Sequence, residues 1–600
     1  MNAAPAFTTR PEITGTFGAV TSTHWIASAV GMSILEKGGN AFDAAAATGF
    51  VLQVVEPHLN GPLGDMPVLI WPAGADEPTV ICGQGVTPAG ATLAHYQDEG
   101  LSRIPGSGLL ATVVPGAFDA WMLMLRDHGT LPLRTVLEPT IHYAKNGHPV
   151  LHRVSVTIDG LAAFFQKEWP SSAATWLPDG KAPSPRSLFK NPALAATWER
   201  LLSEAETREG RTAQIEAARD VFYEGFVAEA IDGFLQDACL MDGGGERRKG
   251  VLSGQDMAGW RASYENPLST TYHGWDVWKA STWSQGPILL QSLNMLSHAS
   301  LDQMDLNGAD FVHTVTETMK LSFADREAYF GDPNHAAIPI ETLMSAEYAA
   351  TRFGQLTETA NLEQRPGSIA GYAEWAERAV ARAAELFEPG DAVGAGEPTM
   401  AHLGEKRGDT CHLDVADRWG NTVAATPSGG WLQSSPVVPG LGMPLNSRAQ
   451  MFWLEPGLPT SLAPGIRPRT TLSPSMARDP SGRRLAFGTP GGDQQDQWQL
   501  IYLLRLIHGQ MGLQEAIDAP LFHSSHFQSS FYPRLAEPGG LLAEPSFDAT
   551  VLAELRARGH DLTITGAWEL GRLTAAAVDA NGMLHAAATP RLMQAYAVGR

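Results

Sequence analysis

One junction between a loop and a strand carries residue types that could do covalent chemistry. The run Gly408-Asp409-Thr410-Cys411-His412 ends a charged, glycine-rich stretch, and an alternating segment typical of a strand follows it. A hydroxyl in that place suits an enzyme that cuts its own chain between Asp409 and Thr410. The freed α-amine can then act as base for the weakly nucleophilic Thr side chain. Cys411 offers a thiol as an alternative nucleophile, but Thr410 fits the break between loop and strand better.

The elements around this junction must place Thr410 against groups that polarise an amide. Two hairpins are expected after it, with strands at 412–416 and 422–425 and at 573–578 and 583–588. Between them a strand at 485–489 leads through the turn Pro490-Gly491-Gly492-Asp493 into a helix at 494–508. Before Thr410 we expect a buried strand at 66–71 and helices at 26–37, 41–54, 116–126, 133–146, 291–298 and 309–329. This order indicates an α+β fold with helices on mostly antiparallel sheets.

The composition is that of an ordinary globular protein. The 600 residues are 44% hydrophobic and carry a formal net charge of -22, which argues against binding to nucleic acid or to an anionic membrane. Three widely spaced cysteines imply no disulfide framework. The longest apolar stretch, 44–55, is too short to span a bilayer, and the first residues lack the pattern of a signal peptide. We therefore expect a cytoplasmic protein.

No other catalytic pattern in the sequence is as specific. His523 and His526 are spaced like a pair of metal ligands, but no acidic partner is obvious. The motifs of zinc proteases, phosphate-binding loops and α/β-hydrolases are absent. We expect neither a metal nor an organic cofactor.

Short motifs occur in a fixed order along most of the chain. They are GGNAFDAA at 38–45, GDP at 331–333, TCH at 410–412, DRWGN at 417–421, RPRTTLSP at 467–474 and GTPGG at 488–492. In this order and spacing they resemble the γ-glutamyltranspeptidase family of N-terminal nucleophile hydrolases. The resemblance implies a four-layer αββα sandwich formed by the large and small subunits of one cleaved precursor. The large subunit would be 1–409, with a helical insertion at 164–211 and a mobile pre-cleavage loop at 389–409, and the small subunit would be 410–600.

The resemblance also assigns roles to individual residues. Thr410 matches the nucleophile and the new N-terminus of the small subunit. Gly491 and Gly492 match a Gly-Gly pair whose backbone N–H groups face the oxyanion, and Ser428 matches a Thr that holds the amine and hydroxyl of the nucleophile.

A second set of matched residues concerns the substrate. Thr470 and Thr471 match a Ser-Ser pair that contacts the acyl group, with strand or turn hydroxyls as the alternative interpretation. Asp493, next to the Gly-Gly pair, is a further candidate for substrate binding. His412 is expected to be a packed strand residue and not a base.

Departures from the family concern the recognition of the substrate. Gln84 stands where the family carries an Arg that clamps a carboxylate, and Gln cannot supply that charged fork. Gly430 replaces an Asn, and Arg448 and Met451 replace the Gln and Asp that read the carboxylate and amine of a γ-glutamyl group. Arg448 could receive a carboxylate from another direction, or it could form a structural ion pair.

These observations predict a self-processing amidohydrolase that hydrolyses a small-molecule acyl amide through an acyl-enzyme on Thr410. Its substrate is not expected to be an ordinary γ-glutamyl compound, because the residues that read that group are replaced. One alternative is a true γ-glutamyl hydrolase or transferase acting on glutathione-type substrates. A second is an uncleaved, inactive homologue that serves as a binding protein. The sequence leaves open whether two αβ units pair as a dimer.

Overall fold

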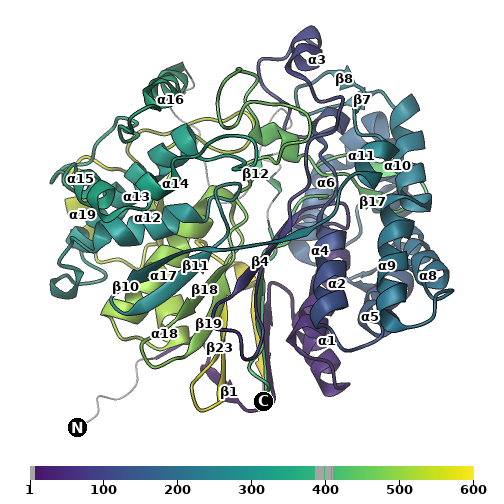
Figure 1. Ribbon diagram of the computed structural model, residues 1–600, viewed down its shortest axis with the longest axis horizontal. Coiled ribbons are helices and arrows are strands. Elements are labelled where there is room, and N and C mark those ends of the chain that lie inside the picture. The colour runs from purple at the N-terminus through teal and green to yellow at the C-terminus, as the bar shows by residue number, and fades with distance from the viewer. Residues whose placement is uncertain (1–6, 386–396, 399–406, 409) are drawn as a thin grey trace.

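The computed structural model describes residues 7–385, 397–398, 407–408 and 410–600. Within these residues, two seven-stranded antiparallel sheets pack face to face (Figure 1). The first sheet has the order β25 (Tyr596–Gly599), β2 (Gly18–Ser22), β14 (Leu413–Asp417), β15 (Thr422–Ala425), β3 (Met66–Trp71), β4 (Thr79–Gly83) and β9 (Ser263–Glu265). The second has the order β1 (Ile13–Gly15), β24 (Leu584–Ala588), β23 (Thr574–Val578), β19 (Arg484–Gly488), β18 (Ser475–Arg478), β11 (Trp275–Lys279) and β10 (Leu268–Tyr272).

Alternation along the strands decides which residues lie between the sheets. In β14, Ala416 packs against residues of the second sheet, whereas Leu413 and Val415 join the core on the helical side. In β23, Ala576 lies in the same intersheet cluster as Ala416, and Ala575 joins the other helical core. Small side chains on both inner faces let the strands around Thr410 approach the second sheet closely.

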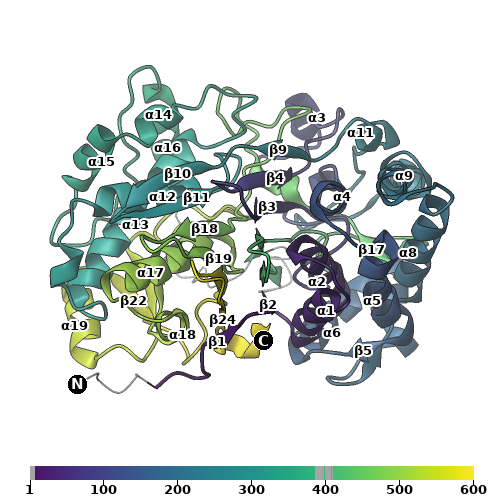
Figure 2. The same ribbon diagram turned by 60° about the horizontal axis from the view of Figure 1, so that its bottom comes forward.

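Helices cover the outer face of each sheet (Figure 2). On the first sheet lie α1 (Trp25–Glu36), α2 (Ala41–Val55) and α4 (Ala117–His128), and outside them α5 (Leu133–Asn146), α6 (His152–Glu168), α7 (Pro170–Trp176), α8 (Pro192–Ala205), α9 (Arg211–Tyr223) and α10 (Phe226–Asp237). On the second sheet lie α12 (Pro287–Leu296), α17 (Gln495–His508) and α18 (Leu513–Asp518), with α13 (Ala309–Tyr329), α15 (Ala346–Phe353), α16 (Ala373–Glu385) and α19 (Ala549–Ala557) further out. None of the helices in the described residues is both long and apolar enough to cross a membrane.

Smaller elements complete the described chain. Short helices are α3 (Leu93–Asp98), α11 (Gly254–Ala258) and α14 (Ile340–Leu343). Short strands pair as β5 (His148–Pro149) with β6 (Leu188–Phe189), β7 (Leu240–Met241) with β8 (Arg247–Arg248), β12 (Glu397–Pro398) with β13 (Arg407–Gly408), and β16 (Val437–Val438) with β17 (Met443–Pro444). A three-stranded sheet contains β20 (Phe522–Ser524), β21 (Gly540–Ala543) and β22 (Asp561–Ile564). Apart from β12 and β13, the predicted loop 389–409 lies outside the described residues, and so does Asp409.

Most elements expected from periodicity are present. The helices predicted at 41–54, 133–146 and 309–329 are α2, α5 and α13, and both predicted hairpins form, as β14 with β15 and as β23 with β24. The helix predicted at 291–298 begins earlier and ends earlier, because α12 spans Pro287–Leu296. Pro287 suits a first helical position, where its fixed φ is favourable and its missing N–H would have no intrahelical partner.

Helix α2 shows how local sequence signals place a helix against the first sheet. The Asn40 side chain accepts hydrogen bonds from the amides of Phe42 and Asp43, and the Asp43 carboxylate accepts one from the Asn40 amide at 3.1 Å. This capping box fixes the first turn. The Ala-rich helix is buried along its whole length, so it forms a layer between the first sheet and the outer helices.

The segment 164–211, predicted as a peripheral helical insertion, contributes to the main core of its half. Trp198 on α8 stacks on Phe118 with ring centroids 5.7 Å apart, and it meets Phe50 of α2 edge-on at 5.6 Å. All three rings are fully buried. The helix therefore stabilises the layer behind α2.

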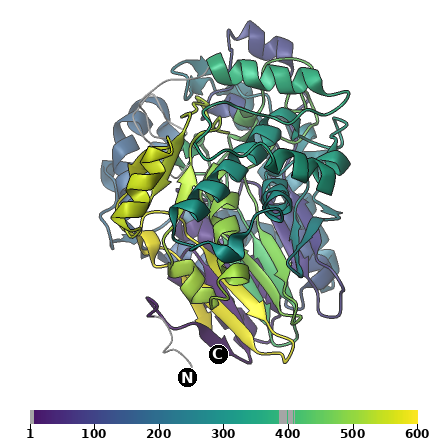
Figure 3. The ribbon, with the colours of Figure 1, turned by 90° about the vertical axis from the view of Figure 1, so that its left-hand side faces the viewer.

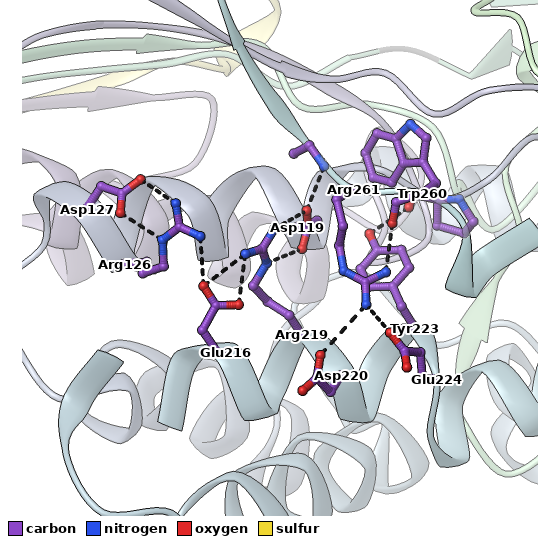
Figure 4. Close-up of polar contacts among 12 residues, drawn as sticks. Asp119, Arg126, Asp127, Glu216, Arg219, Asp220, Tyr223, Glu224, Trp260 and Arg261 are labelled. Atoms are coloured by element: carbon purple, nitrogen blue, oxygen red, sulfur yellow. Dashed lines mark hydrogen bonds and ion pairs between the residues drawn. The ribbon is translucent and has the colours of Figure 1, made fainter. Parts of the chain in front are cut away.

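A chain of ion pairs ties α9 to α4 (Figure 4). The Arg219 guanidinium donates to both oxygens of the buried Asp119 carboxylate, at 2.6 and 2.9 Å. Asp119 also accepts the backbone N–H of Ala262 at 2.6 Å, just before β9. The buried charge of Asp119 is thus matched by three donors, and it joins two helices to the edge of the first sheet.

Strands from the two ends of the chain lie side by side in both sheets (Figure 3). In the first sheet, β2 lies between β25 and β14, and in the second, β1 pairs with β24. The carbonyl of Arg600 accepts hydrogen bonds from the amides of Thr16 and Phe17, at 3.1 and 2.7 Å. Segments before and after Thr410 therefore share both sheets and both cores.

We expect Phe50→Ala to destabilise the protein by about 3–5 kcal/mol, because it removes a buried ring from the contact between α2, α4 and α8. Chemical unfolding of the purified variant measures the change. Phe7→Ala is the matched control, since the Phe7 ring is 94% exposed. Equal losses in the two variants would contradict this description of the core.

Candidate active site

Thr410 lies three residues before the first residue of β14 and is fully buried. It forms an isolated antiparallel bridge with Ser428, and its Oγ1 lies 3.2 Å from the Ser428 Oγ in a hydrogen bond. The structure therefore brings together the predicted nucleophile and the predicted orienting hydroxyl.

Ser428 is held in turn by the loop that precedes β3. The Asp65 amide donates to the Ser428 carbonyl at 2.9 Å, and the Ser428 amide donates to the Asp65 carbonyl at 3.0 Å. This approach requires a glycine before Asp65, because a Cβ on Gly64 would lie 2.0 Å from the Ser428 carbonyl oxygen. Gly430 packs in the same way, with its carbonyl oxygen 2.0 Å from the place of a Cβ on Gly61.

The Asp65 carboxylate joins two further predicted residues to Ser428. Arg448, in the short helix η5 (Arg448–Met451), donates from Nε to Asp65 Oδ1 at 2.7 Å, and both side chains are fully buried. Thr470 Oγ1 lies 3.5 Å from Asp65 Oδ2. Burial raises the pKa of Asp65, and the guanidinium of Arg448 opposes that shift.

Asp65 is a site residue that the sequence analysis missed. Its signal was an acidic residue at the end of a Gly- and Pro-rich loop, directly before a buried strand. Arg448, predicted either as a substrate contact or as a structural ion pair, forms the ion pair with Asp65. Its contact with a substrate stays a prediction.

Gly491 and Gly492 form the turn between β19 and α17. Their φ angles are +127° and +54°, and a Cβ on Gly491 would lie 2.4 Å from the Trp498 ring, so only glycine fits there. No acceptor among the described residues takes the Gly491 N–H. Backbone donors at a helix start are a suitable environment for a developing oxyanion.

The Gly-Gly turn follows β19, and β19 lies across the intersheet core from β14, the strand that follows Thr410. β19 packs against β14, and a Cβ on Gly488 would lie 2.3 Å from the His412 ring. No hydrogen bond between described residues joins Gly491 or Gly492 to Thr410. The oxyanion role of the two glycines stays a prediction.

His412 is a packed strand residue, as predicted. Its Nδ1 lies 2.8 Å from Thr426 Oγ1, and its Nε2 lies 2.9 Å from Asp414 Oδ1. Asp414 also accepts hydrogen bonds from Thr21 and Thr574. With both ring nitrogens in this buried network, His412 positions the start of β14 and is not available as a base.

Cys411 points to the opposite side of β14 from His412. Its Sγ donates to Glu56 Oε2 at 3.4 Å, and Thr23 Oγ1 donates to the same oxygen. Burial raises the pKa of the Cys411 thiol and also raises that of Glu56. A thiol held protonated in this way is a poor nucleophile, which favours Thr410.

The other predicted substrate residues are distributed around this centre. The Thr470 amide donates to the Trp283 carbonyl at 2.7 Å, and the Thr471 hydroxyl is buried with no partner among the described residues. Asp493 accepts from the Ser530 hydroxyl at 2.6 Å and pairs with Arg326. The buried Gln84 amide donates only to the Gly85 carbonyl, at 3.2 Å, so no described contact brings it to Thr410.

Arginines surround Glu327 on the side of Asp493. Arg469 Nη2 lies 3.0 Å from Glu327 Oε2, and Trp453 Nε1 donates to Glu327 Oε1 at 2.9 Å. Burial alone would raise the pKa of Glu327. The guanidinium groups of Arg469, Arg382, Arg534 and Arg326 outweigh burial and lower that pKa to about 2.

Two groups of side chains in the described part of the chain are close enough to hold a metal ion. Neither includes the residues around Thr410 or the pair His523 and His526, and the expectation that no cofactor is needed stays a prediction. The two groups are His273, Asp302 and His508, and His313, Glu317 and His560.

Comparison with known proteins identifies the family. The model of the family described as gamma-glutamyltranspeptidase matches residues 27–599. The chain belongs to the γ-glutamyltranspeptidase family. This confirms the resemblance drawn from the sequence motifs.

Relatives in the family carry different activities in their names. A glutathione hydrolase-like YwrD proenzyme of Bacillus subtilis (strain 168) is 30% identical over 97% of this chain and 98% of its own length. An acylase ACY 1 proenzyme of Pseudomonas sp. (strain SE83) is 29% identical over 96% of this chain and 92% of its own. An oxamate amidohydrolase proenzyme of Klebsiella pneumoniae subsp. pneumoniae is 29% identical over 96% of this chain and 97% of its own.

Several solved structures share the fold of this protein over the whole chain. Two structures of LmbA2991 share 52% and 51% of residues with this chain, cover 99% of it and 100% of their own chains, and superpose with TM-scores of 0.93 and 0.91. A cephalosporin acylase from Bacillus halodurans is 25% identical over 100% of this chain and 99% of its own, with a TM-score of 0.80. This family member therefore has the fold of a relative that is a cephalosporin acylase.

We expect Glu327→Gln to reduce the stability of this family member in a pH-dependent way. A carboxyl whose pKa is lowered from 4.5 to about 2 stabilises the fold fully above its unfolded pKa and loses that contribution as the pH falls toward 2. The loss of stability relative to the wild type should therefore be large at about pH 7 and smaller at about pH 3. Thermal unfolding of both proteins across this range measures it.

Glu341→Gln is the control, because Glu341 is exposed on the short helix α14. Its difference from the wild type should stay small at every pH. A Glu327→Gln effect that does not change with pH would contradict the assignment of Glu327 as a charge held by the surrounding arginines.

Proposed function

We propose that the protein is a self-processing amidohydrolase that hydrolyses an acyl amide through an acyl-enzyme on Thr410. The observation that carries this proposal is the contact of Thr410 Oγ1 with Ser428 Oγ, 3.2 Å apart at the start of β14. This contact supports Thr410 as the nucleophile and Ser428 as the hydroxyl that orients it, at the position where the proposed small subunit begins. The names of three full-length relatives as proenzymes support a precursor that is cut.

In the proposed processing step, Thr410 Oγ1 attacks the carbonyl carbon of residue 409. The C–N bond to Thr410 breaks, the acyl group moves from nitrogen to oxygen, and the α-amine takes up the proton. Water then hydrolyses the ester, which yields a large subunit of 1–409 and a small subunit of 410–600. The two subunits would stay together in an αββα sandwich, since each contributes strands to both sheets.

In the mature enzyme the α-amine of Thr410 would act as the base. It takes the hydroxyl proton while Oγ1 attacks the substrate carbonyl, and Gly491 and Gly492 donate their N–H groups to the oxyanion. Collapse of the intermediate breaks the amide bond, and the amine leaves with the proton. Water, activated by the same α-amine, attacks the ester and releases the acid. Ser428 would orient the amine and hydroxyl throughout.

The substrate is proposed to lack the γ-glutamyl group. Gln84 does not reach Thr410 through any described contact, Gly430 has no side chain, and Arg448 pairs with Asp65. None of these residues supplies an available guanidinium that could bind the carboxylate of a γ-glutamyl group through two hydrogen bonds. The names of the acylase and the oxamate amidohydrolase, 29% identical to this chain, favour other acyl groups.

A second candidate is a γ-glutamyl hydrolase of the glutathione type. The relative from Bacillus subtilis, named as glutathione hydrolase-like, favours it. The two candidates differ in rate on γ-glutamyl anilide and on anilides of acyl groups without an α-amine. Faster turnover of γ-glutamyl anilide would select the second candidate.

We expect the purified wild type to contain two chains that separate before Thr410, and Thr410→Ala to remain one chain. Intact mass spectrometry under denaturing conditions measures both. Of these two proteins, only the wild type should release amine from an N-acyl anilide, because Thr410 supplies both the nucleophile and the base. Thr359→Ala, which changes an exposed Thr, is the control and should be cut like the wild type.

Two outcomes would overturn this proposal. One is a wild type that remains a single chain after prolonged incubation, which would favour an uncleaved binding homologue. The other is a Thr410→Ala protein that is cut at the same bond, which would assign the processing to another group.

A further inference from the structure

Four buried arginines form a cluster beside the segments that carry the proposed acyl and oxyanion contacts. We call Arg326, Arg382, Arg469 and Arg534 the arginine cluster, and the exposure of each is below 9%. Arg469 directly precedes Thr470, and Arg326 pairs with Asp493, which directly follows the Gly-Gly turn. The cluster is thus connected to both sides of the proposed site.

Three of the four guanidinium groups have carboxylate partners. Arg326 pairs with Asp493, and Arg469 pairs with Glu327. Arg382 lies 3.2 Å from Glu455. These three charges are therefore paired within the chain, although Arg382 shares Glu455 with Arg378.

Arg534 is the exception in the cluster, because no carboxylate of the described residues forms an ion pair with it. Its Nη2 donates to two backbone carbonyls, those of Gln450 at 2.8 Å and Phe452 at 3.3 Å, and its guanidinium lies 4.1 Å from the Trp453 ring centroid. Its Nη1 is buried and has no hydrogen-bond partner in the part of the chain that the structure describes. A guanidinium buried in this way is costly unless an anion completes it.

Other features of the segments around the cluster are unusual for a packed interior. Arg534 has a φ of +68°, which is unusual for a residue with a side chain and marks a constrained backbone. Neither polar atom of the buried Gln528 side-chain amide has a partner among the described residues, whereas the Gln528 backbone carbonyl accepts a hydrogen bond from Arg326. The Thr471 hydroxyl is also buried without a described partner. Burial lowers the pKa of Arg534 to about 9, and the nearby carboxylate of Glu327 opposes that shift.

We propose that the arginine cluster is a carboxylate subsite of the active site, in which Arg534 Nη1 donates to a carboxylate of the substrate. The four guanidinium groups share three carboxylates, so one further negative charge would balance the cluster. The planar guanidinium of Arg can donate two parallel hydrogen bonds to a carboxylate. The substrate is therefore an amide that carries a carboxylate on its acyl part or on its leaving amine. This inference rests on the proposed amidohydrolase function and names its substrate class.

The test compares matched substrates with and without the carboxylate. In the acyl arm, glutaryl 4-nitroanilide is compared with valeryl 4-nitroanilide. In the amine arm, valeryl 4-aminobenzoate is compared with valeryl anilide. We expect the wild type to prefer the anionic member of one arm by about 10- to 100-fold in kcat/KM, the size of a charge-assisted hydrogen bond. The arm that shows the preference tells which part of the substrate carries the carboxylate.

Arg534→Met should reduce that ratio to near one, and Arg534→Lys should give an intermediate ratio because it keeps the charge but loses the fork. Arg378→Met is the matched control. Arg378 is more exposed than the cluster and already pairs with Glu374 and Glu455, so its loss should leave the ratio unchanged.

The outcomes separate this inference from the proposed function. If the wild type is cut before Thr410 and hydrolyses neutral amides without preferring either anionic substrate, the subsite is wrong and the amidohydrolase stands. A preference that survives in Arg534→Met also overturns the subsite. If the wild type is neither cut nor active on any amide, the proposed function itself fails. Should Arg534→Met not fold, the wild-type ratios and the Lys variant still decide.

Discussion

The arrangement of the site depends on one close approach between two backbone segments. The loop before β3 and the segment after β15 exchange two hydrogen bonds between Asp65 and Ser428. Only a chain without a side chain at position 64 can come this near, because a Cβ there would overlap the Ser428 carbonyl oxygen. Ser428 in turn forms a hydrogen bond with Thr410, so the place of the Thr410 hydroxyl follows from a contact on the neighbouring loop.

Buried carboxylates connect the contact between Asp65 and Ser428 to more distant parts of the chain. Asp65 has its oxygens directed to Arg448 and Thr470, and Asp493 has its oxygens directed to Arg326 and Ser530. Each carboxylate lies next to a predicted site residue and is matched by donors from distant parts of the chain. Such networks are costly when incomplete, so they fix the loops that carry them in one geometry. Arg534 differs, because its Nη1 has no hydrogen-bond partner among the described residues and its Nη2 donates to backbone carbonyls.

Much of the fold could be predicted from the sequence because its signals are local. The helices predicted at 41–54 and 309–329 and the hairpin predicted at 573–588 are each encoded within a few neighbouring residues, and all were confirmed. Thr410 and Ser428 could be proposed because motifs around them are local as well. Asp65 and Arg534 could not, since their meaning depends on partners such as Arg448 and Trp453 that lie far away in the sequence. The contribution of α8 to the main core was missed for the same reason: its Trp198 packs on rings from α2 and α4.

The central claim of this account is that Thr410 carries the acyl group during turnover. The most direct test is to quench the wild-type enzyme in acid during hydrolysis of an N-acyl anilide and to map the small subunit by peptide mass spectrometry. We expect the peptide that begins at Thr410 to be heavier by the mass of the acyl group, which is attached as an ester to the Thr410 hydroxyl. An acyl group on the thiol of Cys411, or on a peptide that does not contain Thr410, would contradict it.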